Sequence, residues 1–282
     1  MGFQNSAFLG EEETASIYYH DIFDYALDAK EIIKWRVGEK GLALFTKTKE
    51  ILNKDGFYFL KNKENLLYKK TLRERISNRK LEIVKKNASV LNKIPTVLGI
   101  FVTGALAMNN AEEESDVDLM IITNRNSLWL TRLLVYLILK VINSSVRKPG
   151  EIYQKDKLCL NIWLDESALS WNLQDRNIYS AHEIAQIKSI VDKGDIYQRF
   201  LQKNIWILDY WPNSVKIENI KHKTKNYSKN KYSNKGCLFE RFCFWIQYKY
   251  MEKRITREKI SLHKAIFHPK NWGEAVLKKL SS

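Results

Sequence analysis

The stretch FVTGALAMNNAEEESDVDLMIIT, residues 101–123, decides how the chain is organised. An apolar run enters Gly104, a polar and acidic loop follows, and Asp116 and Asp118 stand at the head of a second apolar run. On a β-strand, residues i and i+2 share a face and lie about 6.5–7 Å apart at Cα. Neighbouring carboxylates raise each other's pKa unless a cation lies between them. The stretch therefore predicts two strands and a turn arranged around a cation.

The cation expected here is Mg²⁺, which prefers oxygen ligands from one or two carboxylates together with substrate phosphates. Two such ions, about 3.5–4 Å apart, can hold the attacking and the leaving oxygen of a phosphoryl transfer. Gly104 lets the backbone turn sharply and approach a ligand closely. The alternative for SDVDL, residues 115–119, is a solvated acidic loop entering a strand.

Gly104, a ten-residue spacer after Ala105, and Asp116-Val117-Asp118 resemble the Gly-Ser…Asp-x-Asp signature of the DNA polymerase beta-like nucleotidyltransferase superfamily. The resemblance covers residues 96–165. It implies a nucleotidyltransferase-type domain with a mixed sheet. It also implies transfer of a nucleoside monophosphate from a nucleoside triphosphate to an acceptor hydroxyl, with release of pyrophosphate.

The same resemblance assigns the site residues. Asp116 and Asp118 would be catalytic and would hold two Mg²⁺ ions, or Mn²⁺ in their place. The residues expected to bind the nucleotide lie in and around the turn: Thr103, Gly104, Ala105, Ser115 and Asn161.

Two positions depart from the family pattern. Ala105 replaces the family's Ser, and Asn161 stands where a third carboxylate is expected on the strand LCLNIWLDE, residues 158–166. An amide cannot act as a general base. Asp165, at the end of that strand with the same parity, is therefore taken as the third catalytic residue. Otherwise the substrate supplies the base, or the enzyme is weak or inactive.

The segment before residue 95 predicts helices at residues 16–27, 28–38 and 42–53, and then a hairpin whose polar turn is NKEN, residues 62–65. Three helices followed by a hairpin resemble a winged helix-turn-helix. The helix at 42–53 would be its recognition helix, with Lys47, Lys49 and Lys54 near its surface. Such domains bind DNA or only mediate protein contacts, and both alternatives stay open. A long basic helix, residues 71–93, follows.

The fold class predicted is α+β, in three segments. Residues 1–94 form the winged-helix-like domain and its connecting helix, residues 95–215 the nucleotidyltransferase domain, and residues 216–282 a basic linker with C-terminal helices. In the second segment, strands at 96–104, 115–123 and 157–165 alternate with helices at 127–143, 179–191 and 194–208. In the third, 216–236 is a linker and 237–262 is helical.

Charge and cysteine content indicate which partners the protein binds and which compartment it occupies. Of the net charge of +15, residues 216–282 carry +12. This favours a nucleic acid or an anionic surface as partner, or serves only solubility. Three cysteines in no zinc-binding pattern, and an N-terminal stretch unlike a secretory signal, predict reduced thiols and a cytoplasmic protein. The apolar run 128–142 contains Arg132 and Lys140, so we expect a core helix and no membrane span.

Two functions follow. The first is a Mg²⁺-dependent nucleotidyltransferase. The alternative is a degenerate nucleotidyltransferase fold that serves as a nucleic-acid-binding or regulatory module, which Ala105 and Asn161 favour. The sequence AHEIAQ, residues 181–186, resembles a zinc-protease motif, but Gln186 replaces the second His, and His182 is interpreted as structural.

Overall fold

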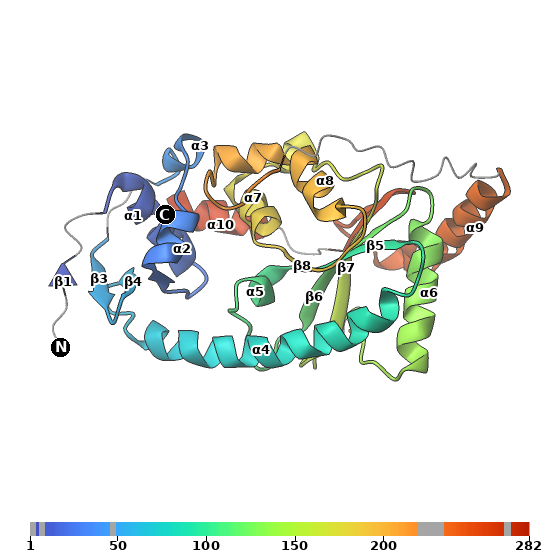
Figure 1. Cartoon of the computed structure of the whole chain (residues 1–282), viewed down its shortest axis with the longest axis horizontal. Helices are drawn as coiled ribbons and strands as arrows, with labels where there is room; N and C mark the ends of the chain where they lie inside the picture. The colour runs from blue at the N-terminus through green and yellow to red at the C-terminus, as the bar shows by residue number, and fades with distance from the viewer. Residues whose placement is uncertain (1–3, 6–8, 46–48, 219–233, 268–271, 282) are drawn as a thin grey trace.

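The computed structural model describes residues 4–5, 9–45, 49–218, 234–267 and 272–281 (Figure 1). Within these ranges the chain is an α+β protein with a small antiparallel sheet near the N-terminus and a larger mixed sheet. The coarse fold class predicted from the sequence is therefore confirmed. Lys47 and most of the predicted linker, residues 219–233, lie outside the described residues.

The N-terminal part begins with three helices, and the last two of them are short. Asp28 and Glu31 form a capping box at the start of α2, because the Asp28 side chain accepts from the Glu31 amide and Glu31 accepts from the Asp28 amide. The helices are α1 (Glu11–Asp21), α2 (Ala29–Lys34) and α3 (Glu39–Leu42).

The predicted recognition helix at 42–53 is wrong. The chain leaves α3 at Leu42, and residues 51–54 form a strand that pairs with residues 57–60. The turn between them is Asp55-Gly56, with both residues at positive φ, which is the strongest short hairpin signal in a sequence. The predicted turn at 62–65 is wrong for the same reason. The sheet has the order β1 (Gln4–Asn5), β3 (Ile51–Lys54), β4 (Phe57–Leu60), β2 (Leu27–Asp28).

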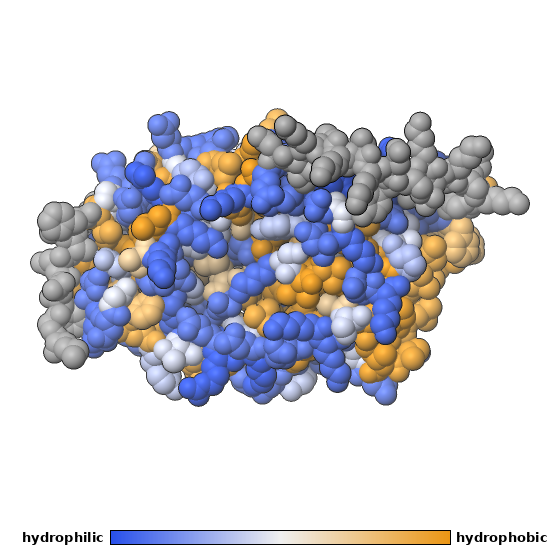
Figure 2. Space-filling view, in the orientation of Figure 1, coloured by the Kyte–Doolittle hydropathy of each residue, from blue (hydrophilic) through white to orange (hydrophobic). Residues whose placement is uncertain are grey.

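A single helix of 27 residues, α4 (Asn65–Leu91), connects the two sheets and runs along one side of the molecule (Figure 1). It begins six residues before the predicted start. Its outward face is strongly hydrophilic, as the band along the lower edge of Figure 2 shows. Its other face buries Val84, Ala88 and Leu91 against the larger sheet.

The larger sheet has the strand order β8-β5-β6-β7-β10-β9. Among the strands that the structure describes, β6 and β7 are the one parallel pair, and α6 is the crossover between them. The edge strand β8 is formed by residues 188–192, of which 188–191 are predicted as helix, and two strands from the predicted C-terminal segment complete the other edge. The bounds are β5 (Val97–Val102), β6 (Val117–Thr123), α6 (Leu128–Val141), β7 (Leu158–Asp165), β8 (Lys188–Asp192), β9 (Lys259–Ile260) and β10 (Lys264–Ile266).

Helices cover both faces of this sheet. One apolar cluster joins the sheet to α4 and α6, and α9 packs outside α6. The other cluster contains Tyr19 and Trp35 of the N-terminal part, Phe200 of α8 and Val276 of α10, so residues from all three predicted segments share one core. The remaining helices are α5 (Gly104–Ala107), α7 (Ile178–Ala185), α8 (Ile196–Lys203), α9 (Asn234–Met251) and α10 (Trp272–Ser281).

The apolar run in α6 is amphipathic. Leu128, Trp129 and Val135 are fully buried, whereas Leu137 and Val141 are exposed, and apolar atoms gather on this end of the molecule in Figure 2. None of the helices formed by the described residues has the length and apolar character needed to span a membrane.

Candidate metal and nucleotide site

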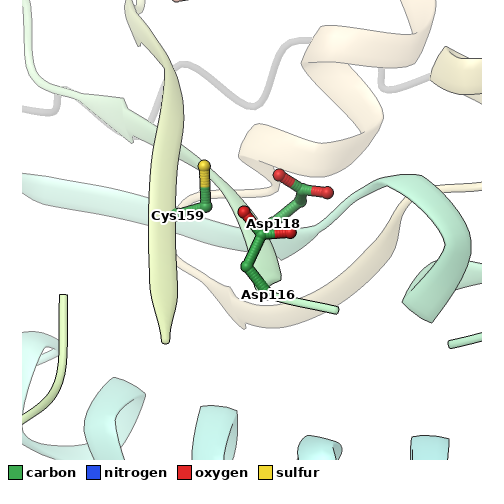
Figure 3. A group of neighbouring side chains, drawn as sticks. All are labelled: Asp116, Asp118 and Cys159. Atoms are coloured by element: carbon green, nitrogen blue, oxygen red, sulfur yellow. The ribbon is translucent and has the colours of Figure 1, made fainter. Parts of the chain in front are cut away.

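Two carboxylates and a thiol meet where β6 and β7 begin. Asp116 immediately precedes β6, Asp118 is its second residue, and Cys159 on β7 is the register partner of Asp118. One ligand atom from each of the three lies within 4.8 Å of the others. Figure 3 shows the two aspartates side by side and the thiol beside them on the neighbouring strand.

The turn at Gly104 closes over Asp118. Gly104 has φ of +62°, and a Cβ at this position would lie 2.9 Å from the Asp118 carboxylate oxygen Oδ2. Any larger residue would therefore be strained and would press on the carboxylate. The amide of Thr103 donates to the Asp118 carbonyl oxygen at 3.1 Å, which holds the turn against β6.

An arginine balances part of the negative charge. Arg147 lies in the connection between α6 and β7 and donates from Nη1 to Asp116 Oδ2 at 2.6 Å. The same nitrogen lies 3.7 Å from Cys159 Sγ. A cationic group therefore occupies the place where the oxygen and sulfur atoms converge.

Asp118 is less well compensated than Asp116. Burial, and then the negative charge of Asp116, raise the pKa of Asp118 to about 7. A carboxyl group with this pKa is partly protonated at neutral pH and gains strongly from a bound cation.

Asn161 reaches Asp118 because β7 has an extra residue. Leu119 pairs with Leu160 and Met120 pairs with Ile162, so Asn161 is the unpaired residue of a bulge. Its Nδ2 donates to Asp118 Oδ1 at 2.7 Å. Its Oδ1 is buried and has no hydrogen-bond partner among the described residues.

Asp165, predicted as the third catalytic residue, lies away from this cluster, so its predicted grouping with the two aspartates is wrong. It pairs with Thr123 at the opposite end of β6 and β7 from Asp118. Its fully buried carboxylate accepts from the amides of Asn126 and Ser167, and it lies 2.6 Å from His263 Nδ1. Asp165 therefore joins three loops at the far end of β7, where its contacts are those of a structural residue.

A carboxylate that sequence reasoning passed over lies opposite the cluster. Glu183 of α7 accepts from Gln186 Nε2 at 2.7 Å, and the same amide nitrogen lies 3.4 Å from the Gly104 carbonyl oxygen. Burial, and then the charge of Asp118, raise the pKa of Glu183 to about 8. The signal was present in AHEIAQ, but Gln186 was interpreted there as a missing zinc ligand rather than as a partner of Glu183.

Glu183 also faces a large cavity of about 1180 Å³. Thr103 and Met120 line it from the sheet, Asn177 and Tyr179 from the segment around α7, and Trp272 from α10. The cavity therefore extends from the neighbourhood of Gly104 along the face of the sheet that carries Asp118. Its mixed polar and aromatic lining is typical of small-molecule sites.

The other predicted nucleotide-binding residues are spread around the turn. Thr103 is buried beside the cavity, and Ala105 is exposed on α5. Ser115 donates to the Glu112 carbonyl oxygen at 2.8 Å and so closes the acidic loop. His182, which precedes Glu183 in α7, packs with His20, Trp35 and Trp211 in the core, and this agrees with the interpretation of His182 as a structural residue.

The acidic loop before Asp116 is anchored to α4. Buried Lys80 donates to the Ser115 carbonyl oxygen at 2.7 Å and to Asp156 at 2.8 Å. Arg79 and Lys155 bind Glu113 at 3.0 and 2.7 Å. These contacts hold the acidic loop against α4, and they thereby fix the position of Asp116, which follows the loop.

No family model, curated protein or solved structure matches this chain.

Proposed function

We propose that this protein transfers a nucleoside monophosphate from a nucleoside triphosphate to an acceptor hydroxyl, with the help of divalent cations held by Asp116 and Asp118. The observation that carries the proposal is the contact of Gly104 with Asp118, in which a turn that admits only glycine closes over a paired carboxylate. In the sequence, Gly104, Asp116 and Asp118 have the order and spacing of the Gly-Ser…Asp-x-Asp signature of the nucleotidyltransferase superfamily.

The residues present suit an Mg²⁺ or Mn²⁺ ion. Two carboxylates share one face, and the buried Asn161 Oδ1 beside them is a polar oxygen without a partner among the described residues. A cation bound there would neutralise charge on the triphosphate and on the leaving pyrophosphate. Arg147 can donate to a phosphate oxygen from the same side, because its guanidinium is partly exposed and already reaches Asp116.

Glu183 is our candidate for the general base. In the reaction, the acceptor oxygen forms a bond to the α-phosphorus while the bond from that phosphorus to the pyrophosphate oxygen breaks. The acceptor proton must go to a nearby base. Asn161 cannot take it, Asp165 is at the far end of β7, and Glu183 lines the cavity next to Asp118.

The assay uses each labelled nucleoside triphosphate with Mg²⁺ or Mn²⁺ and a panel of RNA, protein and small-molecule acceptors. We expect transfer of label by the wild-type protein and loss of transfer in Asp116→Asn and Asp118→Asn. Asp165→Asn is the matched control, because it removes a carboxylate from the same sheet without touching the cluster. Equal loss in all three variants, or no transfer by the wild type, would contradict the proposal.

A second function is favoured by one observation. The β7 strand presents Cys159 and Asn161, and no carboxylate, to the aspartates. A degenerate domain that binds a nucleotide without turning it over, in a regulatory or nucleic-acid-binding protein, would have this composition. Nucleotide binding with Mg²⁺ but without transfer would support it. The N-terminal order of three helices and a hairpin remains a proposed winged-helix-like arrangement, now without the recognition helix at 42–53.

A further inference from the structure

The thiol of Cys159 is the part of the cluster that an Mg²⁺ site does not explain. Magnesium takes oxygen ligands and does not select thiolates, whereas Zn²⁺ and similar transition-metal ions bind carboxylate, imidazole and thiolate. Cys159 is nevertheless aligned with Asp118 by strand register and lies within 4.8 Å of both carboxylates.

We propose that Cys159 is a metal ligand and that the cluster of Asp116, Asp118 and Cys159 takes a thiophilic divalent cation of the Zn²⁺ class. The inference builds on the cation site of the proposed function, but it concerns the choice of metal and holds with or without nucleotidyl transfer. Three protein ligands leave one further position of a tetrahedral site, which Asn161 Oδ1 or a substrate atom can fill.

The separations suit this assignment. Zinc–sulfur and zinc–oxygen bonds of about 2.3 and 2.1 Å place the ligand atoms of a tetrahedral site about 3.5 Å apart. The upper limit of 4.8 Å within the cluster is larger by an amount that side-chain rotation can close. All three residues stand at the start of strands within one sheet, so the backbone need not move.

Asn161 supplies an independent observation. It is 6 % exposed, its Nδ2 contacts Asp118, and its Oδ1 has no partner among the described residues. Rotating the amide by half a turn would bring Oδ1 to about the place of Nδ2, beside Asp118 Oδ1. Two oxygens at such a distance repel each other unless a cation or a proton lies between them, so a cation on Asp118 would satisfy the stranded oxygen.

The guanidinium of Arg147 lies beside the proposed ligand atoms of Asp116 and Cys159. Its Nη1 contacts Asp116 Oδ2 at 2.6 Å and lies 3.7 Å from Cys159 Sγ. A positive charge is therefore stabilised between these two ligand atoms when metal is absent. Binding of the ion would displace the guanidinium from Asp116 and release the thiol proton to solvent, since the sulfur ligates as thiolate.

Titration of the metal-free full-length protein with Co²⁺ tests the proposal, because a cobalt–thiolate bond gives a charge-transfer absorption band in the near ultraviolet. We expect this band in the wild type, its removal by stoichiometric Zn²⁺ and its persistence in a large excess of Mg²⁺. The band should be lost in Cys159→Ser and kept in Cys243→Ser, a change of a buried cysteine on α9. Since loss of a residue that only orients a ligand costs about 10–100-fold in metal affinity, loss of the thiolate should cost at least 100-fold.

Absence of the band in the wild type would overturn the inference even if a variant failed to fold, as would its survival in Cys159→Ser or its removal by Mg²⁺. The outcome is separable from that of the proposed function. A Cys159-dependent band in a protein that transfers no nucleotide would leave the metal site standing alone. Transfer with Mg²⁺ that is unchanged in Cys159→Ser, with no cobalt band, would leave only the transferase.

Discussion

Gly104 lies so close to Asp118 that an added Cβ would stand 2.9 Å from the carboxylate oxygen Oδ2. The backbone at Gly104 also has φ of +62°, a conformation that other residues adopt at a cost. Two separate requirements, one conformational and one steric, therefore converge on the residue that begins α5. They can be separated by experiment.

Gly104→Ala should lower both stability and cation affinity. The positive φ alone costs about 1–2 kcal/mol in the free energy of unfolding. Gly150→Ala is the matched control, because Gly150 has φ of +78° and an added Cβ there meets nothing within 4 Å. Urea denaturation should show a loss of stability in both variants, larger in Gly104→Ala because its Cβ also presses on Asp118, whereas calorimetric titration with Mn²⁺ should show weaker binding only for Gly104→Ala. Unchanged Mn²⁺ affinity would disprove the proposed contact between the turn and the cation site.

Asp118 and Asp165 should respond in opposite ways to replacement by Asn. Asp165 accepts hydrogen bonds from two backbone amides and contacts His263, so Asp165→Asn should destabilise the fold by about 1–3 kcal/mol and leave metal binding intact. Asp118→Asn removes a buried carboxyl group whose pKa is raised by burial and by Asp116, and it should abolish metal binding with little loss of stability. Thermal unfolding and metal titration of both variants test this contrast, and the reverse pattern would restore Asp165 as a site residue.

The strands that carry the cluster could be predicted from the sequence, because each is a short apolar run bounded by polar or turn residues. The runs around Val97, Val117 and Leu158, and the crossover helix at Leu128, are all found in the structure. The alternation of these strands and helices can be predicted from neighbouring residues alone, and so can the shared face of Asp116 and Asp118. These elements place the paired carboxylates without help from distant parts of the chain.

The errors arose where local preference and tertiary pairing disagree. Lys, Glu and Leu in residues 42–53 are good helix formers, but the Asp55-Gly56 turn fixes a hairpin that the sheet then stabilises. The strand at 188–192 follows α7 with little interruption, and only its pairing with β5 identifies it. Of the two strands from the C-terminal part, β10 pairs with β7 across about 100 residues of sequence, and β9 pairs with β10.

Cys159 and Glu183 were not predicted as site residues, and the contact of Asn161 with Asp118 was not predicted, because all three depend on register or on tertiary packing. Cys159 faces the aspartates because β6 and β7 are parallel and Asp118 is opposite Cys159. Asn161 turns toward Asp118 because of a bulge, and Glu183 approaches from a helix on another part of the chain. Asp165 was chosen by parity alone, but the strand is long enough to carry it out of reach.

The pair of buried histidines predicts acid sensitivity. His182 Nε2 and His20 Nε2 are 3.1 Å apart, and both rings are buried. Burial lowers the pKa of His20 to about 4, and burial together with His20 lowers the pKa of His182 well below its usual value. Protonation is easier in the unfolded chain, so stability should be full above pH 6.5 and should fall as the pH drops from 6.5 toward 4.

For His20 alone the loss is on the order of 3 kcal/mol. Glu183, with its raised pKa, works in the opposite direction over part of this range, so the wild-type curve is compared with that of His20→Gln. Urea unfolding at pH 7.5 and pH 5 should show a smaller pH effect in His20→Gln than in the wild type. Parallel curves would show that the histidine pair does not set the acid limit.

Glu183→Gln should remove the pH dependence of transfer while the cation remains bound. A general base acts when it is deprotonated, so kcat/KM of the wild type should rise about tenfold per pH unit below the pKa of Glu183 and level off above it. Burial and the charge of Asp118 raise the pKa of Glu183 to about 8, and a cation on Asp118 would remove part of the second effect, so the midpoint should lie between the ordinary value and 8. Glu183→Gln keeps the size of the side chain and a carbonyl oxygen that can accept from Gln186, so Mn²⁺ affinity should change less than threefold, while kcat falls by about 10²–10⁴-fold. Gln186→Glu is an informative second variant, since a carboxylate there would repel Glu183 and move the midpoint of the profile upward. A Glu183→Gln enzyme that keeps the wild-type pH profile would assign the base to the substrate and not to α7.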